Sequence, residues 1–130
     1  MRQAKFSELK TAIRTYLVTN SKYSPYVTTR VMGESYPKVV IEKQNDRQVG
    51  TDGYTREYAN TITFYIYTKE MVFNGSTVSM VTQAEELEEL IKKLMTDYYG
   101  FKLTFDGVTP VLDNEIYRKQ LNYDVRSITR

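Results

Sequence analysis

The side chains that most often perform acid–base and metal chemistry are missing from this sequence. It contains no histidine and no cysteine among its 130 residues. Histidine is the usual general base near neutral pH and the usual nitrogen ligand of metals. Cysteine supplies thiolate nucleophiles, disulfides and zinc ligands. Catalysis would depend on carboxylates, lysine, tyrosine and hydroxyls alone, so we expect a protein that is not an enzyme.

Carboxylates are the remaining groups that could bind a cation. Four of them cluster at Glu85, Glu86, Glu88 and Glu89. Helix capping, the helix dipole and pairing with lysines one turn later explain these residues without a metal. The polar segment 45–53 lacks the alternating acids and closing glutamate of an EF-hand. The glycines form no phosphate-binding motif. We therefore predict no metal site and no cofactor.

Basic and aromatic side chains gather near the start of the sequence. Residues 1–36 hold six basic and two acidic side chains, whereas residues 80–98 hold two basic and five acidic ones. Basic groups neutralise phosphates and aromatic rings stack on bases, so a non-specific nucleic-acid-binding accessory protein is one hypothesis. Head-to-side association of copies, or ordinary solvated faces, would explain the same asymmetry. The residues concerned are Lys5, Lys10, Arg14, Tyr16, Lys22, Tyr23 and Arg30.

Tyrosine is the most unusual feature of the composition. The chain has 12 tyrosines and no tryptophan. A tyrosine ring packs like an apolar group while its hydroxyl stays polar, which suits both strand faces and contacts between proteins. We expect the protein to act through its surfaces.

Two helices must position these groups. The segment 7–19 has apolar residues on one helical face. The segment 83–98 has the stronger pattern, with Thr82 and Glu85 predicted to form a capping box and Gly100 predicted to end the helix. The predicted buried stripe consists of Leu87, Leu90, Ile91, Leu94 and Tyr98, with Met95 beside it.

Strands are predicted at residues 38–44, 56–68, 101–105 and 116–130. In the second of them, Ile62, Phe64 and Ile66 alternate with Tyr65 and Tyr67. Since successive side chains of a strand point to opposite faces, the first three should face the core. The tyrosine face should be half-polar, and it could be solvated or could meet a partner.

The segments between the strands are predicted to be loops and turns. The polar, glycine-containing stretch at about 44–55 is predicted to be a mobile hairpin loop. Residues 22–36 are predicted to form a loop with a short extended piece at 26–31. Asp106 and Gly107 are predicted to form a turn.

The predicted order of elements is helix, strand, strand, helix, strand, strand (α-β-β-α-β-β). Strands joined by connections too short for a crossover must pair antiparallel. We expect one α+β domain over residues 1–130, with an antiparallel sheet of about four strands and two helices packed on one face. No run of about 18 apolar residues and no signal peptide is recognisable, so no membrane association is expected.

This organisation resembles the tail terminator, or tail completion, proteins of long-tailed bacteriophages. It is also similar to related minor capsid proteins that join head and tail. The resemblance covers most of the chain. Its segments are the helix Ser7–Thr19, the strand entry Tyr36–Ile41, the polar hairpin, the strand Asn60–Tyr67, the helix Ala84–Tyr98 and the closing strand Ile116–Val125.

The resemblance implies a structural protein of the virion tail or neck, assembled in the host cytoplasm. Its relatives would form a homo-oligomeric ring, commonly a hexamer, at the head-proximal end of the tail tube. Such a ring would stop polymerisation of the tube protein and contact the head–tail connector protein, while DNA passes through the lumen without sequence readout. Another connector or tail tube component is the alternative within this class.

Contact with a neighbouring subunit or with the tube is predicted for the hairpin and the tyrosine face of the second strand. An edge strand there would add backbone hydrogen bonds to a neighbour. An exposed hairpin tip without a partner is the plainer alternative. The candidate interface residues are Arg47, Val49, Tyr54, Arg56, Tyr65 and Tyr67, and the candidate basic residues facing the lumen are Lys43 and Arg47.

Overall fold

The computed structural model describes residues 6–30, 33, 35–51, 56–109, 111 and 115–129, with the side chains of residues 6, 7, 44–51, 56–59 and 126–129 left out. Its elements are α1 (Phe6–Asn20), β1 (Tyr26–Thr28), β2 (Lys38–Thr51), β3 (Arg56–Thr68), β4 (Met71–Phe73), β5 (Ser76–Val78), α2 (Met80–Lys92), the π-helix η1 (Lys93–Tyr98), β6 (Lys102–Val108) and β7 (Tyr117–Thr129). The α+β class is confirmed.

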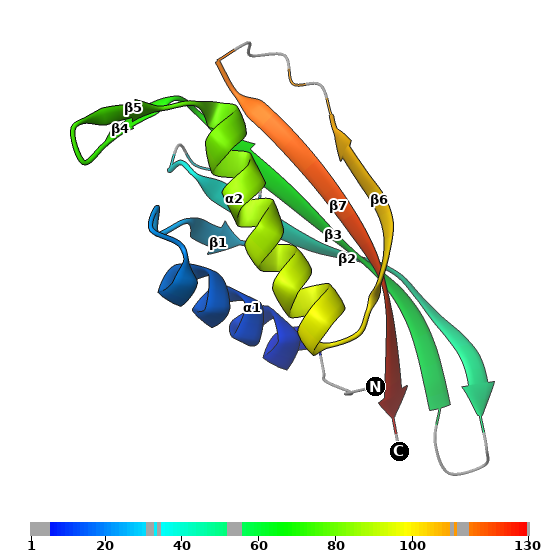
Figure 1. The fold of residues 1–130 in the computed structure, drawn as a ribbon. Coiled ribbons are helices and arrows are strands. Elements are labelled where there is room, and N and C mark those ends of the chain that lie inside the picture. The colour runs from blue at the N-terminus through cyan, green and yellow to red at the C-terminus, as the bar shows by residue number, and fades with distance from the viewer. Residues whose placement is uncertain are drawn as a thin grey trace.

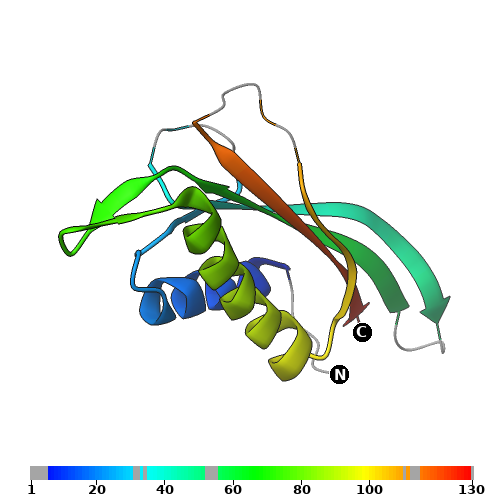
Figure 2. The same cartoon turned by 45° about the horizontal axis from the view of Figure 1, so that its top comes forward.

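The main sheet has five strands in the order β1-β2-β3-β7-β6, and β4 and β5 form a separate hairpin. The prediction of an antiparallel sheet of about four strands is wrong, because β1 pairs parallel with β2. The connection formed by residues 29–37 is long enough for the chain to return and enter β2 in the same direction as β1. Both helices lie on one face of the sheet (Figures 1 and 2).

The core fills the space between the helices and this face of the sheet. Helix α1 contributes Leu9, Ile13 and Leu17, all buried. The sheet contributes residues of one parity from each long strand, as the alternation predicts. Each fully buried aliphatic side chain stabilises the fold by about 1.5–3 kcal/mol. The apolar residues that the long strands bury on this face are Val39, Ile41, Ile62, Phe64, Ile66, Leu121, Tyr123 and Val125.

Helix α2 begins earlier than predicted. Ser79, in extended conformation, is the N-cap, and its Oγ accepts a hydrogen bond from the backbone N–H of Thr82. The predicted capping box led by Thr82 is therefore wrong. The buried side chain of Gln83 donates to the carbonyls of Lys69 and Val78 at 2.6 and 3.2 Å. These bonds join the start of α2 to both ends of the β4–β5 hairpin, which the sequence reasoning missed.

The end of this helical segment is a π-helix. The backbone N–H of Tyr99 donates to the carbonyl of Leu94 at 3.0 Å, five residues earlier. The wider turn shifts the buried position by one residue. Tyr99 is therefore 7% exposed, whereas Tyr98, predicted to be buried, is 62% exposed. Gly100 then ends the helical segment with a positive φ of 73°, as predicted.

The predicted loop at 44–55 is largely strand. Residues as far as Thr51 pair with β3, with register shifts between Gln44 and Arg47 and between Gln48 and Gly50. The segment 52–55 lies outside the described residues. The polar composition of residues 45–51 favoured a loop because such a strand carries little of the apolar alternation that marks a sheet packed on a core.

Candidate interaction surface of the sheet

The far ends of three strands continue past the core. We call residues 45–51, 56–59 and 126–129 the sheet extension; they follow the row of Asn60 and Val125, which are buried. In Figures 1 and 2 this extension projects beyond both helices. Strand β1 pairs only with Lys38–Val40, and β6 reaches only as far as Asp124 of β7. Within the described chain, both outer edges of the extension therefore carry no neighbouring strand.

The face of the sheet opposite the helices carries a second feature, which we call the cation–tyrosine cluster. It alternates three cations with three tyrosine rings. Lys38, Tyr67 and Arg118 occupy one register row across β2, β3 and β7, which explains why they meet. Cations within about 6 Å of a ring centroid are attracted to it. The cluster consists of Tyr36, Lys38, Tyr65, Tyr67, Lys69 and Arg118.

Distances within the cluster show close packing. The Nζ of Lys38 lies 5.3 Å from the centroid of Tyr36 and 5.2 Å from that of Tyr67. The guanidinium of Arg118 lies 5.4 Å from the centroid of Tyr65 and 5.9 Å from that of Tyr67. Lys69 reaches Tyr36 at 4.9 Å. Each of the three tyrosine rings therefore already contacts at least one basic side chain of the same protein.

Burial perturbs the titration of this cluster. Lys38 is only 2% exposed, and its Nζ donates to the carbonyl of Gly33 at 2.9 Å. Burial lowers the pKa of Lys38, because desolvation penalises the ammonium form. Burial and then the negative charge of Glu42 raise the pKa of Tyr65. The cluster thus brings three basic side chains together with three tyrosine rings.

The predicted interface residues fall into separate places. Tyr65 and Tyr67 lie on the face away from the helices, as predicted, but Tyr67 is buried. Arg47, Val49 and Arg56 occupy backbone positions of the sheet extension. At about 3.3 Å per residue, Arg56 and Tyr65 lie about 30 Å apart along β3, so the described candidates do not form one patch.

The two remaining candidates are Tyr54 and Lys43. Tyr54 lies outside the described residues. Lys43, predicted to face a lumen, is exposed on β2 opposite Ile62 of β3. The sequence reasoning did not single out Lys38 or Arg118 for this surface. The signal for them was the register row that they share with Tyr67.

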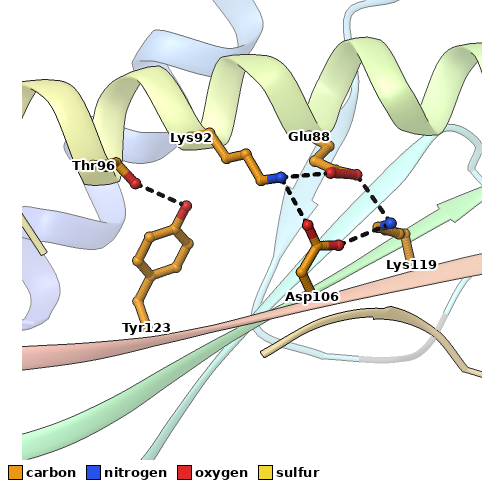
Figure 3. Close-up of polar contacts among 6 residues, drawn as sticks. All are labelled: Glu88, Lys92, Thr96, Asp106, Lys119 and Tyr123. Carbon is orange, nitrogen blue, oxygen red and sulfur yellow. Dashed lines mark hydrogen bonds and ion pairs between the residues drawn. The ribbon is translucent and has the colours of Figure 1, made fainter. Parts of the chain in front are cut away.

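Four charged side chains form a closed ring of ion pairs between α2 and the sheet (Figure 3). Lys92 contacts Glu88 at 2.8 Å and Asp106 at 2.7 Å. Lys119 contacts the same two carboxylates at 3.3 and 2.8 Å. The predicted pair of Glu88 with Lys92 is confirmed. The predicted turn at Asp106 and Gly107 is wrong, because both residues belong to β6, with Gly107 opposite Gln120.

This ion-pair ring holds its members in their charged forms. The hydrogen bonds that Lys92 donates to Asp106 and Glu88 raise the pKa of Lys92, and the hydrogen bond that Lys119 donates to Asp106 raises the pKa of Lys119. Burial would raise the pKa of Asp106, but the two lysines bring it below its usual value. The hydroxyl of Tyr123 lies 3.4 Å from that of Thr96 nearby. We assign the ring to fixing α2 on β6 and β7.

The described residues show neither a metal-binding group nor a membrane-spanning helix. They contain no group of three or more acidic side chains placed to hold a metal ion. None of their helices has the length and apolar character needed to cross a membrane.

No protein-family model matches this sequence, and a search of curated proteins finds no match.

Proposed function

We propose that this protein is a structural component of a bacteriophage virion, a tail terminator or tail completion protein. It would form a homo-oligomeric ring, a hexamer, at the head-proximal end of the tail tube. One side of the ring would bind the tail tube protein and the other the head–tail connector protein. DNA would pass through its lumen.

The observation that carries this proposal is the sheet extension. Its β2 edge and its β7 edge are open on opposite sides of the same three strands. An unpaired strand edge is a template for pairing with another chain. Pairing with a partner strand would satisfy the backbone groups along these edges and stabilise the extension.

The two open edges suit contacts of the kind that close a ring. The β7 edge of one copy would contact the β2 edge of the next, and such head-to-tail contacts close when the rotation between copies divides a full turn. Each backbone hydrogen bond formed would contribute about 0.5–1.5 kcal/mol net. The cation–tyrosine cluster lies outside this contact and remains for another partner.

The β4–β5 hairpin supports a second contact. It projects away from the helices and the sheet in Figure 1. Val72 near its tip is 69% exposed, an apolar side chain with little of its own chain to cover it. We assign the hairpin to the surface that meets the tube or the connector.

The experiment is to examine the purified protein alone and with purified tail tubes by negative-stain electron microscopy. A terminator should give rings, or caps at one end of each tube, and should stop further tube growth. Long filaments formed by the protein alone would assign it to the tube instead. A monomer that ignores tubes at every concentration would refute the proposal.

A further inference from the structure

A pocket between α1 and β1 has a distinctive lining. Lys10 and Arg14 come from α1, one helical turn apart, so their side chains lie on the same side of the helix. The other wall comes from β1 and the residue after it. None of the described residues that line the pocket is acidic. Its lining residues are Lys10, Arg14, Tyr26, Val27, Thr28 and Thr29.

The two cations of this pocket have no partner among the described residues. No ion pair, hydrogen bond or ring contact is formed by Lys10 or Arg14 there. Two lysines elsewhere in the molecule are paired: Lys22 contacts Glu86 at 3.2 Å, and Lys92 joins the ion-pair ring. Two uncompensated cations in a concave site attract an anion.

The remaining walls supply hydrogen-bond donors and an aromatic surface. The Oγ1 of Thr28 accepts from the backbone N–H of Arg30 at 3.1 Å, so its own hydroxyl hydrogen is left to donate. Thr29 is exposed and adds a second hydroxyl. Tyr26 is 48% exposed, and an accessible tyrosine ring at the rim can stack on a base.

We propose that this pocket binds a phosphate group. The guanidinium of Arg14 would bind two phosphate oxygens, and the ammonium of Lys10 and the threonine hydroxyls would contact the others. The phosphate could be free inorganic phosphate or part of the backbone of single-stranded nucleic acid, in which case Tyr26 would meet the adjoining base. This inference does not depend on ring formation.

The test uses the full chain and two probes. Inorganic phosphate is titrated while the amide signals of residues 26–29 are followed by NMR. A fluorescent oligodeoxythymidine is titrated by anisotropy at about 50 mM and about 200 mM salt. Lys10→Gln and Arg14→Gln are compared with Lys102→Gln, which removes the same charge from an exposed position on β6.

We expect each pocket variant to weaken binding about tenfold, the equivalent of losing one charged hydrogen bond, while Lys102→Gln binds normally. Tyr26→Ala should weaken the oligonucleotide and leave inorganic phosphate unchanged if nucleic acid is the source. Phosphate binding without oligonucleotide binding supports the pocket and assigns it to a free phosphate. Absence of binding by both probes, or equal losses in Lys102→Gln, would overturn the inference.

Discussion

Lys38 and Tyr67 lie directly opposite each other on β2 and β3, with the lysine Nζ 5.2 Å from the ring centroid. A buried ammonium is thereby held against an aromatic face. The attraction offsets part of the cost of removing the charge from water.

Replacement of this lysine should change the pH dependence of stability. Because the pKa of Lys38 is lowered in the folded state, the unfolded chain binds more protons between that pKa and the ordinary lysine value. The free energy of unfolding should therefore rise with pH across this interval. Lys38→Met should remove that rise, measured by urea unfolding at several alkaline pH values. Lys102→Met is the exposed control, and an unchanged pH profile in Lys38→Met would contradict the expectation.

Breaking the ion-pair ring should destabilise the fold at neutral pH. Asp106→Asn leaves Lys92 and Lys119 facing each other with one carboxylate fewer. We expect a loss of about 1–2 kcal/mol in the free energy of unfolding, reduced from the value of a fully buried pair because the ring is partly exposed. Chemical denaturation measures it, with Glu85→Gln on the outer face of α2 as control.

The lowered pKa of Asp106 predicts how its contribution to the free energy of unfolding changes in acid. Since the pKa of Asp106 is lowered by folding, its contribution is present above the unfolded aspartate pKa and is lost as pH falls through the folded value. The difference between the original chain and Asp106→Asn should shrink below about pH 4. A difference that is constant down to low pH would mean that the ring does not hold this carboxylate ionised.

The π-helix predicts that two neighbouring tyrosines contribute very differently to the free energy of unfolding. Tyr99 is buried and stacks on Phe101 with centroids 5.3 Å apart, whereas Tyr98 is exposed. Tyr99→Ala should cost about 3–5 kcal/mol by the loss of a buried aromatic ring. Tyr98→Ala should change stability by less than about 1 kcal/mol. Thermal and urea unfolding of the pair decide the point; the reverse order would indicate a regular α-helix.

Truncation of the sheet extension should separate folding from assembly. Ending the chain at Val125 removes residues 126–129 of β7, which form one outer strand of the sheet extension, and leaves every described buried residue in place. The shortened chain lacks the open β7 edge and should sediment as a folded monomer at concentrations where the full chain forms rings. Val72→Thr, on the hairpin, is the control that should still form rings. Rings formed by the truncated chain would move the subunit contact elsewhere.

The sequence predicts those elements that touch the core. The spacing of Leu9, Ile13 and Leu17 identifies α1, and the alternation from Ile62 to Ile66 identifies β3. In each element these residues form the face that packs on the apolar core. The strand residues 45–51 were missed because they lie beyond that core. The shift from Tyr98 to Tyr99 depends on one wide helical turn, which no side-chain pattern marks.

The candidate surfaces were predictable only in part. The tyrosine face of β3 follows from alternation alone. Its partners Lys38 and Arg118 depend on the register of three strands, which is set by pairing between distant segments. The phosphate pocket likewise needs the parallel strand β1 beside α1, and short strands of this kind carry almost no local signal.

Gln83 fixes the two ends of the β4–β5 hairpin, and the Phe73 ring of this hairpin packs edge-on against Tyr23 with centroids 5.5 Å apart. The amide of Gln83 ties together the carbonyls of Lys69 and Val78, where the chain leaves the sheet and where it enters the helix. The chain leaves the sheet and returns to the start of α2 at two points that Gln83 holds together. Residues can therefore be inserted at the turn of Asn74 and Gly75 without displacing α2. The tip can thus diversify to fit new partners while the framework beneath it stays the same.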